Sequence, residues 1–172
     1  MRVRADAIIM AVMSIALLLL FLTPFLNPSG RFLGLDGSVG YIDHLDMWSS
    51  SDPLTFLTYT FGDMFCPQIE SRSFILNGSQ MAFCARDVSI VIGLLIGSII
   101  SFLKVVRVSL RTSLIISVAA FALMIADWCI QHFMSVDLIL TRAITGALFG
   151  ASVSILICCF FPADDSHNNN VG

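Results

Sequence analysis

Three charged side chains stand at the ends of long apolar stretches of this sequence, namely Arg86, Asp127 and Arg142. An ionised group in apolar surroundings costs at least a few kcal/mol unless it is paired. A guanidinium group also binds carboxylates and phosphates through two parallel hydrogen bonds. The three residues therefore predict either an ion-paired clasp or a site for an anionic ligand.

Helical spacing places small residues on the same faces as these charges. Small residues about four positions apart let apolar helices approach closely, so we expect the charged ends to meet. Asp127 should lie within salt-bridge reach of Arg142 or Arg86. Gln131 should follow one turn further out on the same face. The three faces consist of Arg86, Ile90, Gly93 and Gly97; of Ser113, Ser117, Ala120, Met124, Asp127 and Gln131; and of Arg142, Gly146 and Gly150.

The clasp and the ligand site differ in what satisfies the charges. In a clasp, the ions pair with one another and fix the register of the helices. In a ligand site, the surplus arginine holds a small anionic or lipid-linked ligand in an outward-facing polar pocket. Asp87 and Glu70 are the anions that could otherwise balance the two cations. The pocket candidates are Arg72, Arg86, Asp87, Asp127, Gln131 and Arg142.

Catalysis at this site stays open, because no nucleophile with an activating base is evident. Ser73 and Thr145 are hydroxyls without an obvious histidine partner. The sequence contains no Walker loop, dinucleotide-binding fingerprint or H-E-x-x-H motif, so it indicates no particular cofactor.

Composition identifies the solvent around these residues. The chain has 172 residues, of which 57% are hydrophobic and 12% are charged. A soluble domain usually carries roughly 25% charged residues, so a soluble enzyme or a disordered regulator is excluded. The formal net charge of −3 leaves no basic surplus for nucleic acid. The chain is expected to be a multi-pass protein in a lipid bilayer.

Four apolar stretches are long enough to cross a bilayer as helices, so the fold class is an all-α polytopic membrane protein. A signal peptide is a weaker interpretation of the first stretch, because its apolar run is too long and no typical cleavage site follows. A long polar region, 27–86, separates the first span from the second. The expected helices cover about 7–26, 85–103, 113–131 and 138–161.

Basic residues predict the orientation. They cluster before the first span and between the second and third, and the positive-inside rule makes that side cytoplasmic. Both termini, including the polar tail 162–172, are then cytoplasmic, and 27–86 is extracytoplasmic. The expected location is the cell membrane. The residues are Arg2, Arg4, Lys104, Arg107 and Arg111.

The extracytoplasmic region begins as a loop rich in Gly, Ser and Pro. Asp52 and Pro53 then form a helix start, and apolar residues follow at helical spacing. This pattern predicts a short amphipathic helix near 53–65, on the membrane surface or on the helix bundle. A packed loop with scattered aromatic residues is the alternative. Asn77 begins both a glycosylation sequon and a turn signal.

Two of the five cysteines, Cys66 and Cys84, flank the end of the extracytoplasmic region. In an oxidising compartment two nearby cysteines form a disulfide, which would add about 3 kcal/mol of stability. Free thiols are the alternative. Cys129, Cys158 and Cys159 lie in apolar stretches and are interpreted as small buried residues.

The stretch FCPQIESRSFILNGSQMAFCARD resembles a family of prokaryotic multi-pass membrane proteins, domain of unknown function 2085. The family signature combines Cys-His-Gln, Arg-Ser-Phe, a glycine and Cys-x-Arg-Cys. Later Asp-x-x-x-x-Gln and Arg-x-x-Thr-Gly-x-x-x-Gly elements extend the resemblance to residue 150. The matching residues are Cys66, Gln68, Arg72, Ser73, Phe74, Gly78, Cys84, Arg86, Asp127, Gln131, Arg142, Thr145, Gly146 and Gly150.

Two departures from the family signature bear on metal binding. Pro67 replaces the histidine, and Asp87 replaces the last cysteine. The family residues would make good ligands for a zinc-like ion. Here Cys66, Cys84 and Asp87 remain, and a histidine such as His44 or His132 would have to complete the set. The resemblance therefore does not favour a metal site in this chain.

Three functions stay open. The protein is a binding or accessory protein, a membrane-embedded enzyme acting on a lipid-linked or small anionic substrate, or a subunit of a small oligomeric transporter. All three would use the same pocket, and the last implies a homo-oligomer or a larger membrane complex. The resemblance does not choose among them, because the family's activity is uncharacterised.

Overall fold

The computed structural model describes residues 5–106 and 108–161. Four helices in this part are long and apolar enough to cross a membrane, which confirms the expected all-α, four-span architecture. They are α1 (Ala5–Leu22), α4 (Ala85–Phe102), α5 (Leu110–Met134) and α6 (Ile139–Phe160). The tail 162–172 and three of the basic residues used to predict the orientation, Arg2, Arg4 and Arg107, lie outside the described residues.

Two helices differ from their expected bounds for local reasons. α1 gives way to a 3-10 turn, η1 (Thr23–Phe25), because Pro24 lacks the N–H that would continue an α-helix. α5 is longer than expected at both ends. Its N-terminus is capped by the Ser109 hydroxyl, which accepts a hydrogen bond from the Thr112 N–H over 3.2 Å.

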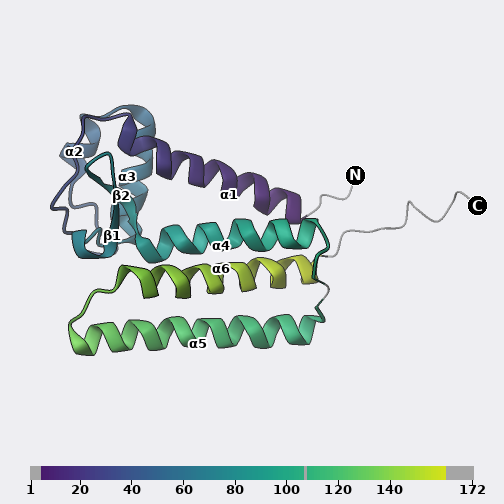
Figure 1. Ribbon diagram of the computed structural model, residues 1–172. Coiled ribbons are helices and arrows are strands. Elements are labelled where there is room, and N and C mark those ends of the chain that lie inside the picture. The colour runs from purple at the N-terminus through teal and green to yellow at the C-terminus, as the bar shows by residue number, and fades with distance from the viewer. Residues whose placement is uncertain (1–4, 107, 162–172) are drawn as a thin grey trace, which may run out of the picture.

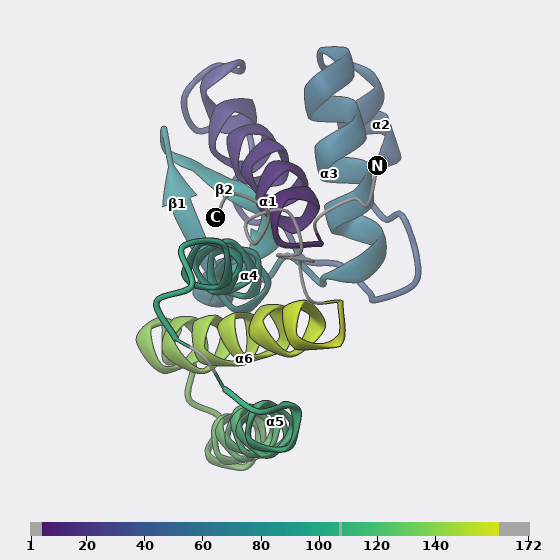
Figure 2. The ribbon, with the colours of Figure 1, turned by 90° about the vertical axis from the view of Figure 1, so that its right-hand side faces the viewer.

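The four spans form a row rather than a square bundle (Figures 1 and 2). α4 and α6 run side by side in the same direction, and α5 packs along α6 at one edge. α1 packs antiparallel to α4 and diverges from it toward one end of the spans. The segment 27–84 covers that end. The start of α1 and the end of α6 lie together at the opposite end (Figure 1).

Glycines set the close approach of α4 and α6. A Cβ atom at Gly93 or Gly97 would overlap the α6 backbone, and one at Gly150 would overlap the α4 backbone. Small residues have this role at membrane helix contacts, since they let van der Waals packing replace the missing hydrophobic driving force. The small-residue faces inferred from the sequence on these two helices therefore do face each other.

The layer at the end of the spans, here called the outer layer, contains 27–84. It comprises α2 (Leu45–Ser49), α3 (Pro53–Phe65), η2 (Glu70–Arg72) and an antiparallel hairpin of β1 (Ser73–Leu76) and β2 (Ser79–Cys84). Sequence reasoning missed α2 and the hairpin. Asn77 and Gly78 form the hairpin turn with φ of 50° and 67°, the left-handed conformation typical of an Asn-Gly turn.

The outer layer has its own aromatic core. The rings of Phe32 and Tyr59 lie 4.5 Å apart, those of Trp48 and Tyr59 lie 4.9 Å apart, and all three side chains are fully buried. Phe32 comes from the glycine-rich loop and Tyr59 from α3. The loop is therefore irregular but packed, and the layer is rigid enough to position side chains above the spans.

α3 runs across the direction of the spans rather than along them (Figures 1 and 2). It begins after Asp52, whose carboxylate accepts hydrogen bonds from the Leu54 and Thr55 N–H groups at 3.0 Å. Leu57 and Phe61 on its surface are 49% and 53% exposed. A helix in this orientation with an exposed apolar face is suited to lie in the membrane interface.

Candidate functional site

Arg86 and Asp127 form the ion pair that joins α4 to α5. Arg86 Nη2 donates to Asp127 Oδ2 over 3.0 Å, and the two side chains are only 14% and 11% exposed. The Gln131 amide donates to the other Asp127 oxygen over 2.8 Å and to the Thr141 hydroxyl over 2.9 Å. The structure therefore contains the predicted salt bridge between Asp127 and Arg86. Gln131 lies one turn further along the same helix, as expected.

Arg142 pairs with a residue that sequence reasoning overlooked, Asp137. Arg142 Nη2 donates to Asp137 Oδ1 over 2.9 Å, and Arg72 Nε donates to the same oxygen over 2.7 Å. Ser71 donates to Oδ2 over 2.6 Å. Asp137 lies in the turn between α5 and α6, and its contacts with Ser71 and Arg72 place that turn beside the outer layer. The extra anion is therefore Asp137 rather than Asp87 or Glu70.

Asp137 stays ionised in this setting. Burial alone would raise its pKa, but hydrogen bonds from Ser71 and Arg72, together with the charges of Arg72 and Arg142, hold the pKa below its ordinary value of 3.8. The stabilisation is therefore fully present above that value and is lost as the pH falls through the lowered pKa. One carboxylate thus links the outer layer, through Ser71 and Arg72, to α6 at neutral pH.

The arginine–aspartate network, defined here as Arg72, Arg86, Arg142, Asp127 and Asp137, holds three cations and two anions. The Nε groups of Arg86 and Arg142 are buried and have no hydrogen-bond partner in the described part of the chain. Each arginine of the network is thus paired with an aspartate, but the network carries a formal net charge of +1.

Asp87 points away from this network, toward the two outer cysteines. Cys84 Sγ donates to Asp87 Oδ2 over 3.1 Å, and the Cys84 N–H donates to Cys66 Sγ over 3.2 Å. The hydrogen bond between the thiols lowers the pKa of Cys66 and raises that of Cys84, while burial acts upward on both. Both thiols are free in this structure, so the disulfide stays a prediction.

The three ligand atoms of Cys66, Cys84 and Asp87 all lie within 4.8 Å of one another. Neither histidine considered as a fourth ligand is part of this group in the described chain. His44 lies beside Asp63 in the outer layer, and His132 stacks on Trp128 with 5.3 Å between ring centroids. The group therefore offers two sulfurs and one carboxylate.

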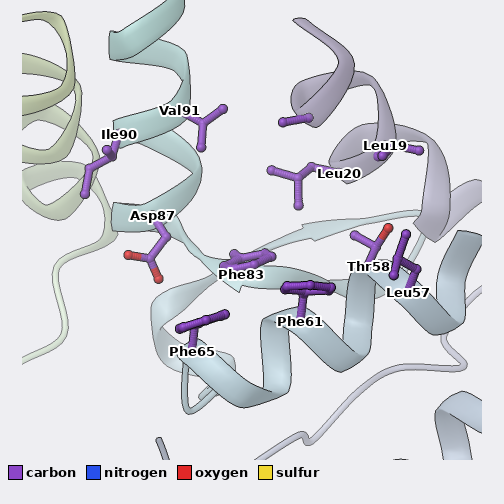
Figure 3. Close-up of a pocket in the computed structure, with 11 residues that line it drawn as sticks. Leu19, Leu20, Leu57, Thr58, Phe61, Phe65, Phe83, Asp87, Ile90 and Val91 are labelled. Atoms are coloured by element: carbon purple, nitrogen blue, oxygen red, sulfur yellow. The ribbon is translucent and has the colours of Figure 1, made fainter. Parts of the chain in front are cut away.

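A cavity of about 490 Å³ opens between α1 and α4, beneath α3 and β2. We call it the groove (Figure 3). Asp87 lines it, whereas Arg86, Asp127 and Arg142 do not. Sequence reasoning missed the groove because its walls come from four elements that are distant along the chain. They are Ala16, Leu19, Leu20, Leu57, Thr58, Phe61, Phe65, Phe83, Asp87, Ile90 and Val91.

A double-mutant cycle tests the ion pair. Arg86→Ala and Asp127→Ala should each lower the free energy of unfolding by about 3–5 kcal/mol, because each leaves a buried charge without its partner. The double variant should lose clearly less than the sum. Unfolding of the purified protein in detergent measures all three.

Arg111→Ala provides the control, since Arg111 is exposed at the far end of α5. Its effect should add to that of Asp127→Ala. Additive losses for Arg86 and Asp127 as well would contradict the pairing.

Comparison with curated proteins and with solved structures gave no match. A family model described as "Predicted membrane protein (DUF2085)" matches residues 66–156, which is slightly more than half of the chain. The match runs from Cys66 through the hairpin and the arginine–aspartate network into α6. The chain therefore belongs to the DUF2085 family of predicted membrane proteins.

Proposed function

We propose that this membrane protein binds an amphipathic, lipid-like ligand in the groove, with the hydrocarbon part among the apolar side chains and the polar head at Asp87. The observation that carries the proposal is the character of the groove. Its lining is apolar except for Thr58 and the Asp87 carboxylate. Its volume of about 490 Å³ falls in the range of small-molecule sites, about 300–1,000 Å³.

The position of the groove supports entry from the bilayer. Its walls are the last turns of α1 and the first turns of α4, next to the outer layer. Phe61 and Phe65 at its rim are 53% and 59% exposed. A lipid diffusing in the membrane would meet this opening sideways, without first crossing water.

The same proposal places the protein in the cell membrane with the outer layer outside and both ends of the chain in the cytoplasm. Lys104 and Arg111 lie in the α4–α5 connection and the first turn of α5, at the end of the spans opposite the outer layer. The positive-inside rule assigns that end to the cytoplasm. The ligand would then come from the outer leaflet.

The charge of Asp87 restricts the charge of the ligand's head group. Asp87 is the charged residue of the groove, and the carboxylate would repel a bare anionic head. A neutral or cationic head fits the site directly. An anionic head fits only if a cation lies between it and Asp87.

Filling the groove tests the proposal. Ala16→Trp places an indole inside the groove and should reduce co-purified lipid by about tenfold, equivalent to about 1.4 kcal/mol. Native mass spectrometry of the protein extracted from membranes measures the retained lipid. Ile15→Trp is the matched control, because Ile15 is the preceding residue of α1, is 60% exposed and does not line the groove. Equal lipid retention by the two variants would overturn the proposal.

A second candidate is a small anion held by the arginine–aspartate network. The buried, unpartnered Nε groups of Arg86 and Arg142 and the formal excess of one positive charge favour it. Arg72 would be the entry point, since its side chain is 33% exposed. Asp127 and Gln131 would orient Arg86 for the anion.

Inorganic phosphate is the probe for this candidate. Phosphate should raise the unfolding temperature of the wild-type protein and have a smaller effect on Arg72→Gln, with chloride at equal ionic strength as the control. If phosphate and chloride change the unfolding temperature of the wild type equally, the network does not bind phosphate and serves only as an ion-paired clasp.

A further inference from the structure

We infer that Cys66, Cys84 and Asp87 bind a divalent cation that prefers thiolate ligands, such as Zn²⁺, with one coordination position open toward the groove. The three ligand atoms lie within 4.8 Å of one another. Zinc bonds of about 2.3 Å to sulfur and about 2.0–2.2 Å to carboxylate oxygen need spacings of this order or slightly smaller. The inference stands independently of the proposed lipid ligand.

The fold brings the three ligands together from separate elements. Cys66 directly follows α3 as its C-cap, Cys84 ends β2 and immediately precedes α4, and Asp87 lies in the first turn of α4. The contact between α3 and β2 is unusually close at Gly62, where a Cβ atom would overlap the Ala82 carbonyl. Cys84 and Asp87 are three residues apart, so they share one face of the first helical turn.

The three ligand atoms are placed so that a metal ion can displace the thiol protons and bind the resulting thiolates. Cys66 is 1% exposed, and its Sγ accepts a hydrogen bond from the backbone N–H of Cys84. Cys84 occupies the N-cap position of α4 and therefore lies next to Asp87 in the first turn of that helix. Metal binding would release the proton of each thiol and replace the hydrogen bond that Cys84 now donates to Asp87.

The charge count is compatible with the bound ion. Two thiolates, one carboxylate and a divalent cation sum to −1. The arginine–aspartate network sums to +1, and Arg142 lies within electrostatic range of Cys84. Asp87 with two protonated thiols also carries −1, so exchanging the two protons for a divalent cation leaves the charge beside the network unchanged.

The open position faces the groove. Three protein ligands with a fourth place for water or a ligand are typical of zinc sites that do more than hold a fold together. Phe65 and Phe83 immediately precede the two cysteines and line the groove together with Asp87 (Figure 3). A water molecule, or the phosphate or carboxylate of a bound head group, would complete the coordination.

Cobalt titration of the full chain tests the site. The purified protein is reduced, stripped of metal in detergent and titrated with Co²⁺ in the absence of added lipid. One equivalent of Co²⁺ should produce the thiolate-to-cobalt charge-transfer band, and Zn²⁺ should abolish it. Cys84→Ser should lose most of the band. Asp87→Asn, which keeps the side-chain shape, should weaken Co²⁺ binding by more than about tenfold.

Cys129→Ser is the control, because Cys129 lies in α5, outside the group, and should leave the titration unchanged. Circular dichroism and a monodisperse elution profile establish that each variant is folded. Three results would overturn the inference: no cobalt–thiolate band in folded wild-type protein, an unchanged titration of Asp87→Asn, or a Cys66–Cys84 disulfide in protein extracted in the presence of an alkylating reagent. Because no lipid is added and the cobalt–thiolate band reports the metal alone, this outcome is separate from that of the Ala16→Trp experiment.

Discussion

The arrangement of the outer layer on the membrane spans depends on the ion pairs and hydrogen bonds of the Asp137 carboxylate. This carboxylate lies in the turn between α5 and α6 and accepts hydrogen bonds from Ser71 and Arg72 of the outer layer and from Arg142 of α6. Arg142 is only 6% exposed, so removing its partner would leave a buried charge unpaired. The groove and the cysteine pair lie where the outer layer meets the spans. Their geometry therefore depends on how firmly this contact is held.

The glycines of α4 and α6 impose a second constraint that acts together with the first. Gly146 lets α6 approach the backbone of Arg86, and Gly150 lets it approach Ile90. This contact occupies one side of α4 and directs Arg86 toward Asp127. Asp87, the next residue, is consequently turned to the other side, where α1 diverges and the groove opens. One helix thus presents a structural ion pair on one face and the candidate binding site on the other.

Local signals in the sequence predicted the elements well. Apolar runs gave the four spans, and the Asp52-Pro53 pair gave α3, which begins at Pro53. Small residues at helical spacing predicted the reach between Asp127 and Arg86. The features missed depend on contacts between distant segments. In the sequence, Asp137 is one acidic residue in a short turn. Only the folded structure places that turn beside Arg72, where Asp137 can pair with both Arg72 and Arg142. The groove has the same origin, because no single segment carries its lining. In the sequence Asp87 counted both as a spare anion and as one of three remaining metal ligands, and the structure places it beside Cys66 and Cys84 rather than beside the arginines.

Hydrogen–deuterium exchange of Asp137→Asn tests most directly whether this carboxylate holds the outer layer to the spans. Asparagine keeps the shape of the side chain but removes the charge that Arg72 and Arg142 share. If the charge of Asp137 holds the outer layer, amide exchange in the hairpin, 73–84, should become faster while exchange in α1 stays unchanged. Asp36→Asn, whose side chain is 94% exposed, should alter neither. Unchanged protection of the hairpin in Asp137→Asn would instead mean that the outer layer is held in place without this contact.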